Sequence, residues 1–186
     1  DIGVSRGLGD VYKRQMFTHL SSMHVPYRGV LYVGLMIDAK GDPYVVEFNV
    51  RFGDPECQVT LPLIEGDVGE LLFGAANDTL ATMDVSFKDQ HALTVVLASE
   101  GYPQSAIKGR NILGADSSQD TAATWISHAG TTHDSMGNLV SSGGRVLAVT
   151  SIANSLEKAR DLSYLRLANI EVQGSHHRTD IGYRAL

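Results

Sequence analysis

Two apolar, β-type segments in the first third of the chain are separated by a run of turn residues. Residues 30–37 (VLYVGLMI) and 44–50 (YVVEFNV) are rich in branched and aromatic side chains, which favour strands. Residues 38–43 (DAKGDP) combine Asp, Gly and Pro, which form tight turns. The pattern therefore predicts an antiparallel hairpin.

Two helices are predicted on either side of this hairpin. Residues 16–25 have a weak helical pattern, which Pro26 ends because the residue before a proline avoids the α region. A stronger helix begins after Asp67, which can cap it together with Glu70. The apolar positions that follow recur at helical spacing, at Val68, Leu71, Leu72, Ala75 and Ala76, as far as Leu80. This segment is predicted to be a packed amphipathic helix.

Beyond residue 84 the chain changes to short apolar segments divided by Gly-, Ser- and Asp-rich loops. The last apolar segment is followed by a helical pattern over residues 156–169. The strands predicted in this half are residues 92–99, 124–128 and 145–151. We therefore predict an α+β fold with a domain boundary near residue 88.

The first fifteen residues (DIGVSRGLGDVYKRQ) differ from the rest. They contain scattered Gly and basic residues but no apolar core of a signal peptide. We interpret residues 1–15 as a tail that is either foreign to the natural protein, like the adapter-derived ends of assembled sequence reads, or a natural disordered terminus.

Composition narrows the class of protein. With 186 residues and 43% hydrophobic content, the chain can bury a core. Its formal charge of −6 and lack of a Lys/Arg cluster argue against a nucleic acid partner. No apolar run approaches the roughly 20 residues that span a bilayer, which argues against a membrane partner. Cys57 is the only cysteine, so no disulfide framework is expected and the cytoplasm is the predicted location.

The most informative segment is residues 47–58, EFNVRFGDPECQ. Because alternate side chains of a strand share a face, Glu47, Asn49 and Arg51 are predicted to lie together. Carboxylate and amide oxygens are hard ligands that suit Mg²⁺, and a guanidinium matches phosphate or carboxylate geometry. The opposite face, predicted to anchor the strand in the core, consists of Val46, Phe48 and Val50.

A loop begins where this strand ends. Gly53 permits close approach of a ligand, and two acidic residues, Asp54 and Glu56, follow it. On spacing alone, the alternative is an ordinary half-exposed strand with a solvated polar face, in which Arg51 pairs with Glu47 or Asp54.

The same segment resembles the signature of the glycinamide ribonucleotide synthetase family. The flanking text is also similar to that family, namely PYRGVLYVGLMID before the signature and DVGELLFGAAND after it. Further similar segments are ALTVVLASEGYP, SHAGT, SSGGRVLAVTSIANSLEKAR and RTDIGYRAL. The resemblance covers essentially all of the chain from Met16 onward.

The resemblance implies an ATP-grasp ligase that phosphorylates glycine with ATP and joins the acyl phosphate to phosphoribosylamine in purine biosynthesis. It implies the C-terminal lobe of an ATP-grasp domain at residues 16–87 and a small β-rich, barrel-like domain at residues 88–186. Glu47 and Asn49 would bind the Mg²⁺ or Mn²⁺ that bridges the ATP phosphates, and catalytic Arg51 would stabilise the transferred phosphate. The residues that would shape the substrate pocket are Gly53, Asp54 and Glu56.

Three features outside this proposed site are further candidates for function. Arg145, after Gly143 and Gly144, either faces the substrate cleft or simply follows a tight turn into a strand. Cys57 has no evident neighbouring base and is predicted to be a small, partly buried residue rather than a nucleophile. The histidines, including His176 and His177, lack metal-ligand spacing and are predicted to be solvated.

The sequence departs from the family pattern because it holds no phosphate-binding glycine loop. The resemblance places the ATP-binding lobes upstream of Met16, so we expect the chain alone to be inactive and its apolar hairpin to be exposed. Two alternatives remain open at this point. One is another ATP-grasp ligase, such as a carboxylase, and the other is a noncatalytic binding module that kept the fold.

Overall fold

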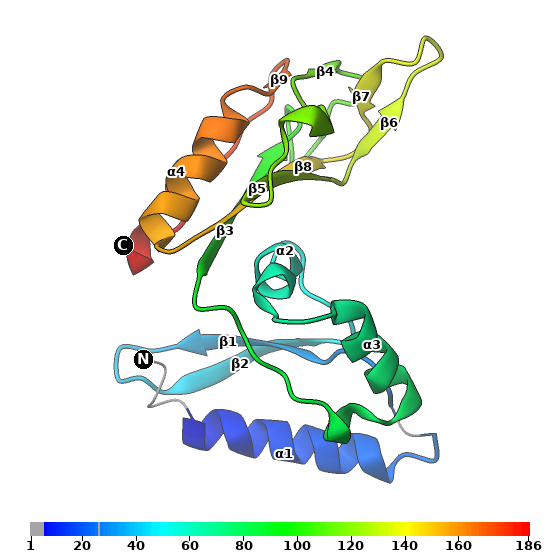
Figure 1. The fold of residues 1–186 in the computed structure, drawn as a ribbon, viewed down its shortest axis with the longest axis vertical. Helices are drawn as coiled ribbons and strands as arrows, with labels where there is room; N and C mark the ends of the chain where they lie inside the picture. The colour runs from blue at the N-terminus through cyan, green and yellow to red at the C-terminus, as the bar shows by residue number, and fades with distance from the viewer. Residues whose placement is uncertain (1–5, 26) are drawn as a thin grey trace. The chain divides into compact units, whose positions relative to one another are not determined.

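A computed structural model describes residues 6–25 and 27–186 of the chain. The chain forms two compact units, one made of residues 1–53 and 67–84 and the other of residues 54–66 and 85–186. Figure 1 shows the order of the helices and strands along the chain. None of the helices in the described residues is long and apolar enough to cross a membrane.

The first unit consists of a hairpin and two α-helices. Its strands pair antiparallel from Tyr32 opposite Asn49 to Ile37 opposite Pro43, with one register shift at Gly34 and Leu35. The predicted hairpin is therefore confirmed. The elements of this unit are α1 (Arg6–Ser22), β1 (Tyr32–Ile37), β2 (Pro43–Asn49), α3 (Val68–Asn77) and the 3-10 helix η2 (Leu80–Thr82).

Helix α3 begins and ends at identifiable caps. The carboxylate of Asp67 accepts hydrogen bonds from the backbone N–H groups of Gly69 and Glu70, at 2.7 and 3.3 Å. The predicted start is therefore confirmed. The helix ends at Asn77, before the predicted Leu80, because Asp78 adopts a left-handed conformation with φ of 65°.

The core of the second unit lies between a three-stranded antiparallel sheet and one helix. The strand order is β3-β8-β5, which places β8 in the centre and explains why it is the most buried strand. Helix α4 packs on β3 and β8, as Figure 1 shows. These elements, all predicted from the sequence, are β3 (His91–Ala98), β5 (Thr124–His128), β8 (Arg145–Ala153) and α4 (Leu156–Leu167).

Shorter elements complete the second unit. Strand β4 pairs with β9, and β6 pairs with β7. They were not predicted, because two or three residues are too few for a periodic pattern. These elements are α2 (Cys57–Thr60), η1 (Leu61–Leu63), β4 (Ile112–Leu113), η3 (Ser117–Gln119), β6 (Thr131–His133), β7 (Leu139–Ser141), β9 (Glu171–Val172) and η4 (Tyr183–Ala185).

Residues 54–66 belong to the second unit because backbone hydrogen bonds join them to residues 85–88. The N–H of Glu65 donates to the carbonyl of Ser86 at 2.9 Å, and the N–H of Lys88 donates to the carbonyl of Leu63 at 2.8 Å. The segment also contacts β3 through α2. A domain boundary at residue 88 stays a prediction, but the compact units already divide between Gly53 and Asp54.

The predicted α+β class is confirmed. One expectation about the N-terminal residues needs correction, and so does one about β2. Residues 6–15 are helical rather than disordered, since α1 starts at Arg6, whereas residues 1–5 lie outside the described residues. That the segment is foreign to the natural protein stays a prediction.

The second correction concerns the face of β2 that was predicted to anchor the core. Val46, Phe48 and Val50 are 64%, 42% and 71% exposed. Strand alternation does place these side chains together, but alternation does not say which face another element covers.

Candidate active site

The signature segment is divided between the two units. Glu47, Asn49, Arg51 and Gly53 belong to the first unit, whereas Asp54 and the residues after it belong to the second. The surroundings of the signature residues are therefore described separately for each unit.

The carboxylate and carboxamide at the end of β2 contact each other. Glu47 and Asn49 are two residues apart on one strand, and Nδ2 of Asn49 donates to Oε1 of Glu47 at 2.9 Å. Glu47 lies opposite Gly34, where an added Cβ would sit only 3.1 Å from Cγ of Glu47. A glycine on the neighbouring strand thus leaves room for the Glu47 side chain, and the sequence interpretation of a shared face agrees with this contact.

This pair fits one edge of a hard divalent cation. Turning the Asn49 amide so that its oxygen faces Glu47 would present two oxygen ligands from one strand. Among the described residues, no three His, Cys, Asp or Glu side chains are grouped closely enough to hold an ion alone. The chemistry of the pair therefore suits Mg²⁺ or Mn²⁺ that takes its other ligands from water and phosphate.

Arg51 lies just beyond the strand with an exposed side chain. Its Nη1 donates to the carbonyl oxygen of Phe52 at 2.8 Å. A guanidinium has five N–H donors, so this single bond leaves most of the fork for an anionic ligand. Gly53, the next predicted site residue, is buried.

In the second unit, Asp54 and Arg145 are brought together although they are far apart in the sequence. Nη2 of Arg145 lies 2.9 Å from Oδ2 of Asp54, and Nη1 donates to the carbonyl oxygen of the same residue at 3.0 Å. Both side chains remain about half exposed, at 40% for Arg145 and 50% for Asp54. The structure thus joins two residues that were predicted separately as substrate-binding.

The backbone before Arg145 is held by residues at the end of β3. The N–H of buried Ser99 donates to the carbonyl of Gly144 at 2.8 Å, and its hydroxyl donates to the carbonyl of Gly143 at 2.7 Å. An added Cβ on Gly144 would overlap the ring of Tyr102. The two glycines therefore permit a close approach that aims Arg145 toward Asp54.

Glu56 and Cys57 stand at the beginning of α2. The carboxylate residue Glu56 is exposed, and its carbonyl accepts from the N–H groups of Val59 and Thr60. Burial, and then the negative charge of Asp54, raise the pKa of the Cys57 thiol. A raised pKa keeps the thiol protonated at neutral pH, which agrees with the view that Cys57 is not a nucleophile.

A cavity of about 380 Å³ lies beside Arg145 in the second unit. His176 and His177 are exposed, as the sequence predicted, but the sequence did not indicate that they line a cavity together with Arg178. That run of adjacent basic residues is the signal that could have indicated the cavity. Its lining consists of Pro55, Thr94, Val95, Val96, Ala98, Tyr102, Pro103, Arg145, His176, His177, Arg178 and Ile181.

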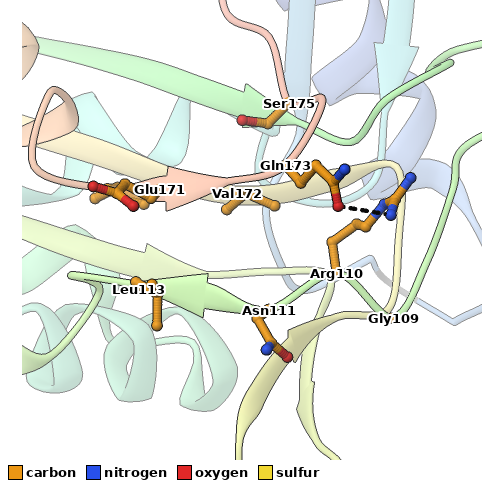
Figure 2. A pocket seen from close by; sticks show the side chains of 9 residues that line it. Gly109, Arg110, Asn111, Leu113, Glu171, Val172, Gln173 and Ser175 are labelled. Atoms are coloured by element: carbon orange, nitrogen blue, oxygen red, sulfur yellow. Dashed lines mark hydrogen bonds between the residues drawn. The ribbon is translucent and has the colours of Figure 1, made fainter.

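A second cavity of about 640 Å³ lies along β4 and β9 and contains none of the predicted site residues. Figure 2 shows Arg110 reaching across it, where Nη1 donates to Oε1 of Gln173 at 2.8 Å. Nη2 of Arg110 also lies 3.1 Å from Oε2 of Glu100. Because these polar side chains bind one another, we assign this cavity a structural role.

Two family models match the chain. Residues 92–184 match the phosphoribosylglycinamide synthetase C domain, and residues 10–57 match the ATP-grasp (A) domain of the same synthetase. The first range contains strands β5 and β8 and helix α4, and the second contains Glu47 and Asn49.

Curated relatives agree with these models. The chain is 44% identical over 162 residues to the phosphoribosylamine–glycine ligase of Caulobacter vibrioides, a match that covers 87% of this chain and 38% of that protein. It is 45% identical over 163 residues to the trifunctional purine biosynthetic protein adenosine-3 of Gallus gallus, covering 87% of this chain and 16% of that protein. The chain therefore spans well under half the length of these relatives.

Solved structures show the same relationship. The crystal structure of phosphoribosylamine–glycine ligase from Thermotoga maritima matches with a TM-score of 0.77 at 30% identity, covering 93% of this chain and 41% of that one. A biotin carboxylase domain from Hydrogenobacter thermophilus matches with a TM-score of 0.62 at 17% identity, covering 94% of this chain and 39% of that one, which shows the fold alone. With its ATP-grasp and C-domain regions both matched, this chain belongs to the phosphoribosylglycinamide synthetase family.

Proposed function

We propose that this chain forms the C-terminal part of an ATP-dependent ligase that joins glycine to 5-phosphoribosylamine, giving glycinamide ribonucleotide, ADP and phosphate. The observation that carries the proposal is the contact between Glu47 and Asn49 at the end of β2, in a chain of this family. The product is an intermediate of purine biosynthesis, and the cytoplasm is the proposed location.

In this proposal, the pair at the end of β2 binds the metal. Oε of Glu47 and Oδ1 of Asn49 would hold Mg²⁺ or Mn²⁺, which supplies positive charge to the phosphates of ATP. Arg51 would bind the transferred phosphoryl group. Its guanidinium donates one hydrogen bond to the backbone, at Phe52, so its other N–H groups can bind phosphate oxygens. Positioning and charge neutralisation, rather than a protein nucleophile, would supply the catalysis.

The reaction would proceed in two balanced steps. A carboxylate oxygen of glycine attacks the γ-phosphorus of ATP and ADP leaves, which gives glycyl phosphate. The amine of phosphoribosylamine then attacks the carbonyl carbon, phosphate leaves with that carboxylate oxygen, and the amine loses a proton. Gly53, Asp54, Glu56 and Arg145 would bind the two substrates during these steps.

The pairing of Asp54 with Arg145 would serve substrate positioning. Ser99 holds the backbone before Arg145 through the carbonyls of Gly143 and Gly144, and the guanidinium of Arg145 is directed by Asp54. Asp54 keeps that guanidinium in place until a carboxylate or phosphate of the substrate competes for it.

The proposed activity needs more protein than this chain. We propose that the ATP-binding lobes belong to further parts of the same polypeptide, and that residues 16–87 and 88–186 are the closing ATP-grasp lobe and the C domain. The chain by itself is then expected to be inactive.

A chimeric enzyme tests the proposal. The region of the Caulobacter vibrioides ligase that matches this chain over 162 residues would be replaced by the present sequence. The chimera is expected to restore growth without purines to a bacterium that lacks its phosphoribosylamine–glycine ligase. A Glu47→Gln chimera is expected to fail, because the metal loses the negative charge of one ligand, whereas a Glu65→Gln chimera, changed at an exposed position outside the signature, should grow.

The result that would contradict the proposal is a chimera that accumulates as folded protein and still does not support growth. Equal growth of the Glu47→Gln and Glu65→Gln chimeras would contradict the assigned role of Glu47.

A further inference from the structure

The segment that leads into Arg145 is held by two other parts of the second unit. This segment, residues 142–145, comes directly before and at the start of β8. One set of contacts comes from Ser99 after the end of β3, and the other comes from Gly130 after the end of β5. Gly130 lies in residues 127–131 (SHAGT), one of the segments that resemble the family.

Ser99 holds the segment from one side. It is only 1% exposed. Its hydroxyl donates to the carbonyl of Gly143 at 2.7 Å, and its backbone N–H donates to the carbonyl of Gly144 at 2.8 Å. Because a buried hydroxyl needs a partner, this contact is maintained in the folded chain. One residue therefore fixes two consecutive peptide groups in front of Arg145.

Gly130 holds the segment from the other side. Its N–H donates to the carbonyl of Arg145 at 2.9 Å, and its carbonyl accepts from the N–H of Ser142 at 2.7 Å. An added Cβ on Gly130 would lie 2.7 Å from the carbonyl oxygen of Arg145 and 2.7 Å from Cα of Gly143. Both are backbone atoms, which cannot rotate away as a side chain can. Any larger residue at position 130 must therefore push the segment aside.

The fixed backbone limits where the side chain of Arg145 can reach. Its guanidinium makes two contacts with Asp54, at 2.9 and 3.0 Å, and both depend on where the backbone of Arg145 lies. An arginine that is already oriented loses less freedom when it binds a ligand, which favours binding. Contacts to the backbone of residues 142–145 can therefore affect binding at the guanidinium.

We propose that Ser99 and Gly130 are positioning residues for Arg145, which clamp residues 142–145 from two sides and thereby keep the guanidinium at Asp54. The consequence for catalysis rests on the proposed function, in which Arg145 binds a substrate. The consequence for the contact between Arg145 and Asp54 rests on the structure alone.

The first measurement is made on the chain itself. Nη1 and Nη2 of Arg145 bind different oxygens of Asp54, so rotation about the Nε–Cζ bond should be slow and give two separate ¹⁵N signals. Ser99→Ala removes the hydroxyl and is expected to make the two signals merge at a lower temperature. Gly130→Ala should do the same, because it displaces the segment. Unchanged Arg145 signals in both variants would overturn the proposal.

Ser163→Ala is the matched control. Ser163 is also fully buried, and its hydroxyl donates to a backbone carbonyl, that of Leu93 near the other end of β3, at 3.1 Å. This variant should lower the unfolding temperature about as much as Ser99→Ala but leave the Arg145 signals unchanged. Merging of the signals in Ser163→Ala as well would show general loosening of the unit and would overturn the positioning role.

The second measurement uses the chimeric ligase. Ser99→Ala is expected to raise the KM of one substrate about fivefold, the effect of roughly one hydrogen bond. This substrate is the one, glycine or phosphoribosylamine, whose KM also rises in Arg145→Gln, and kcat should change by less than about twofold. In the Arg145→Gln background, Ser99→Ala should raise this KM no further, because the residue through which it acts is gone. An equal rise in both backgrounds would contradict the proposal.

The two measurements separate the positioning role from the proposed function. An inactive chimera together with Arg145 signals that depend on Ser99 would contradict the proposed function and support the positioning role. An active chimera whose Arg145 signals depend on neither Ser99 nor Gly130 would contradict the positioning role alone. The unfolding temperature of each variant identifies loss of folding, and Ser99→Ala, which only removes an atom, provides the test if Gly130→Ala does not fold.

Discussion

Arg145 owes its direction to small residues and to one aromatic ring. Ser99 holds the carbonyls of Gly143 and Gly144, and the ring of Tyr102 occupies the space that a Cβ on Gly144 would need. Because φ of Gly144 lies outside the left-handed region, the requirement for glycine comes from this packing and not from backbone strain. We therefore infer that Tyr102, by packing against Gly144, positions Arg145.

Gly144→Ala is expected to destabilise the second unit by about 1–3 kcal/mol, because an inserted methyl group must displace the Tyr102 ring. Denaturant unfolding of the single variants and of the double variant with Tyr102→Ala measures the coupling between the two positions. The cost of Gly144→Ala should be smaller when Tyr102 is absent. An equal cost in both backgrounds would show that the ring is not what excludes the methyl group.

Among the helices and strands, the local sequence was sufficient to predict an element where a capping residue is followed by apolar residues at regular spacing. Asp67 and Glu70 predicted the start of α3, and short apolar segments divided by Gly-, Ser- and Asp-rich loops predicted the strands of the three-stranded sheet. The short strands β4 and β9 were missed because they depend on partners about sixty residues away along the chain.

The N-cap of α3 gives a direct prediction about that helix. Asp67→Ala should destabilise it by about 0.5–2 kcal/mol, because two N–H groups of the first turn lose their acceptor. Hydrogen exchange of the amides of Gly69 and Glu70 measures the effect. Asp67→Asn keeps a side-chain oxygen and should exchange nearly like the unchanged chain, whereas equally fast exchange in both variants would contradict the capping role.

The turn between β6 and β7 is expected to depend on pH. Hydrogen bonds from the side chain and backbone of Asn138 hold the pKa of Asp134 below its ordinary value of 3.8. The stabilisation is therefore complete above the ordinary pKa and is lost as the pH falls through the lower, folded value. NMR shifts of the Met136 and Asn138 amides should follow this titration, and Asp134→Asn should abolish it. Amide shifts that titrate unchanged in Asp134→Asn would contradict the assignment.

At the scale of the whole molecule, the two units differ in how their apolar surface is used. The second unit encloses a core in which β8 is almost entirely buried, whereas the hairpin and α3 of the first unit carry exposed apolar side chains. The most exposed of these are Met36, Val46, Val50 and Phe73. In the proposed intact enzyme, the ATP-binding lobes would cover this surface.

The exposed apolar side chains of the hairpin and α3 predict self-association of the isolated chain, because burying them between copies removes apolar surface from water. Sedimentation velocity over a range of concentrations should show species larger than a monomer. The double variant Val46→Lys with Phe73→Lys should shift the distribution toward monomer. A monodisperse monomer of the unchanged chain at high concentration would contradict this prediction.

The candidate site could be predicted from the sequence only in part. The contact between Glu47 and Asn49 could be predicted, because side chains two residues apart on a strand share a face. The pairing of Asp54 with Arg145 joins positions 91 residues apart, and no local pattern contains that distance. The prediction that His176 and His177 are solvated agrees with their exposure, but the cavity that they line also needs residues of β3, which are distant in the sequence.

The central claim is that this chain completes a ligase that activates glycine as an acyl phosphate. The most direct test is transfer of ¹⁸O in the purified chimera with glycine labelled in its carboxylate, ATP and phosphoribosylamine. We expect one ¹⁸O in the inorganic phosphate for each amide formed, and loss of this transfer in the Glu47→Gln chimera. Amide formation with no ¹⁸O in the phosphate, or no reaction in a folded chimera that binds ATP, would contradict it.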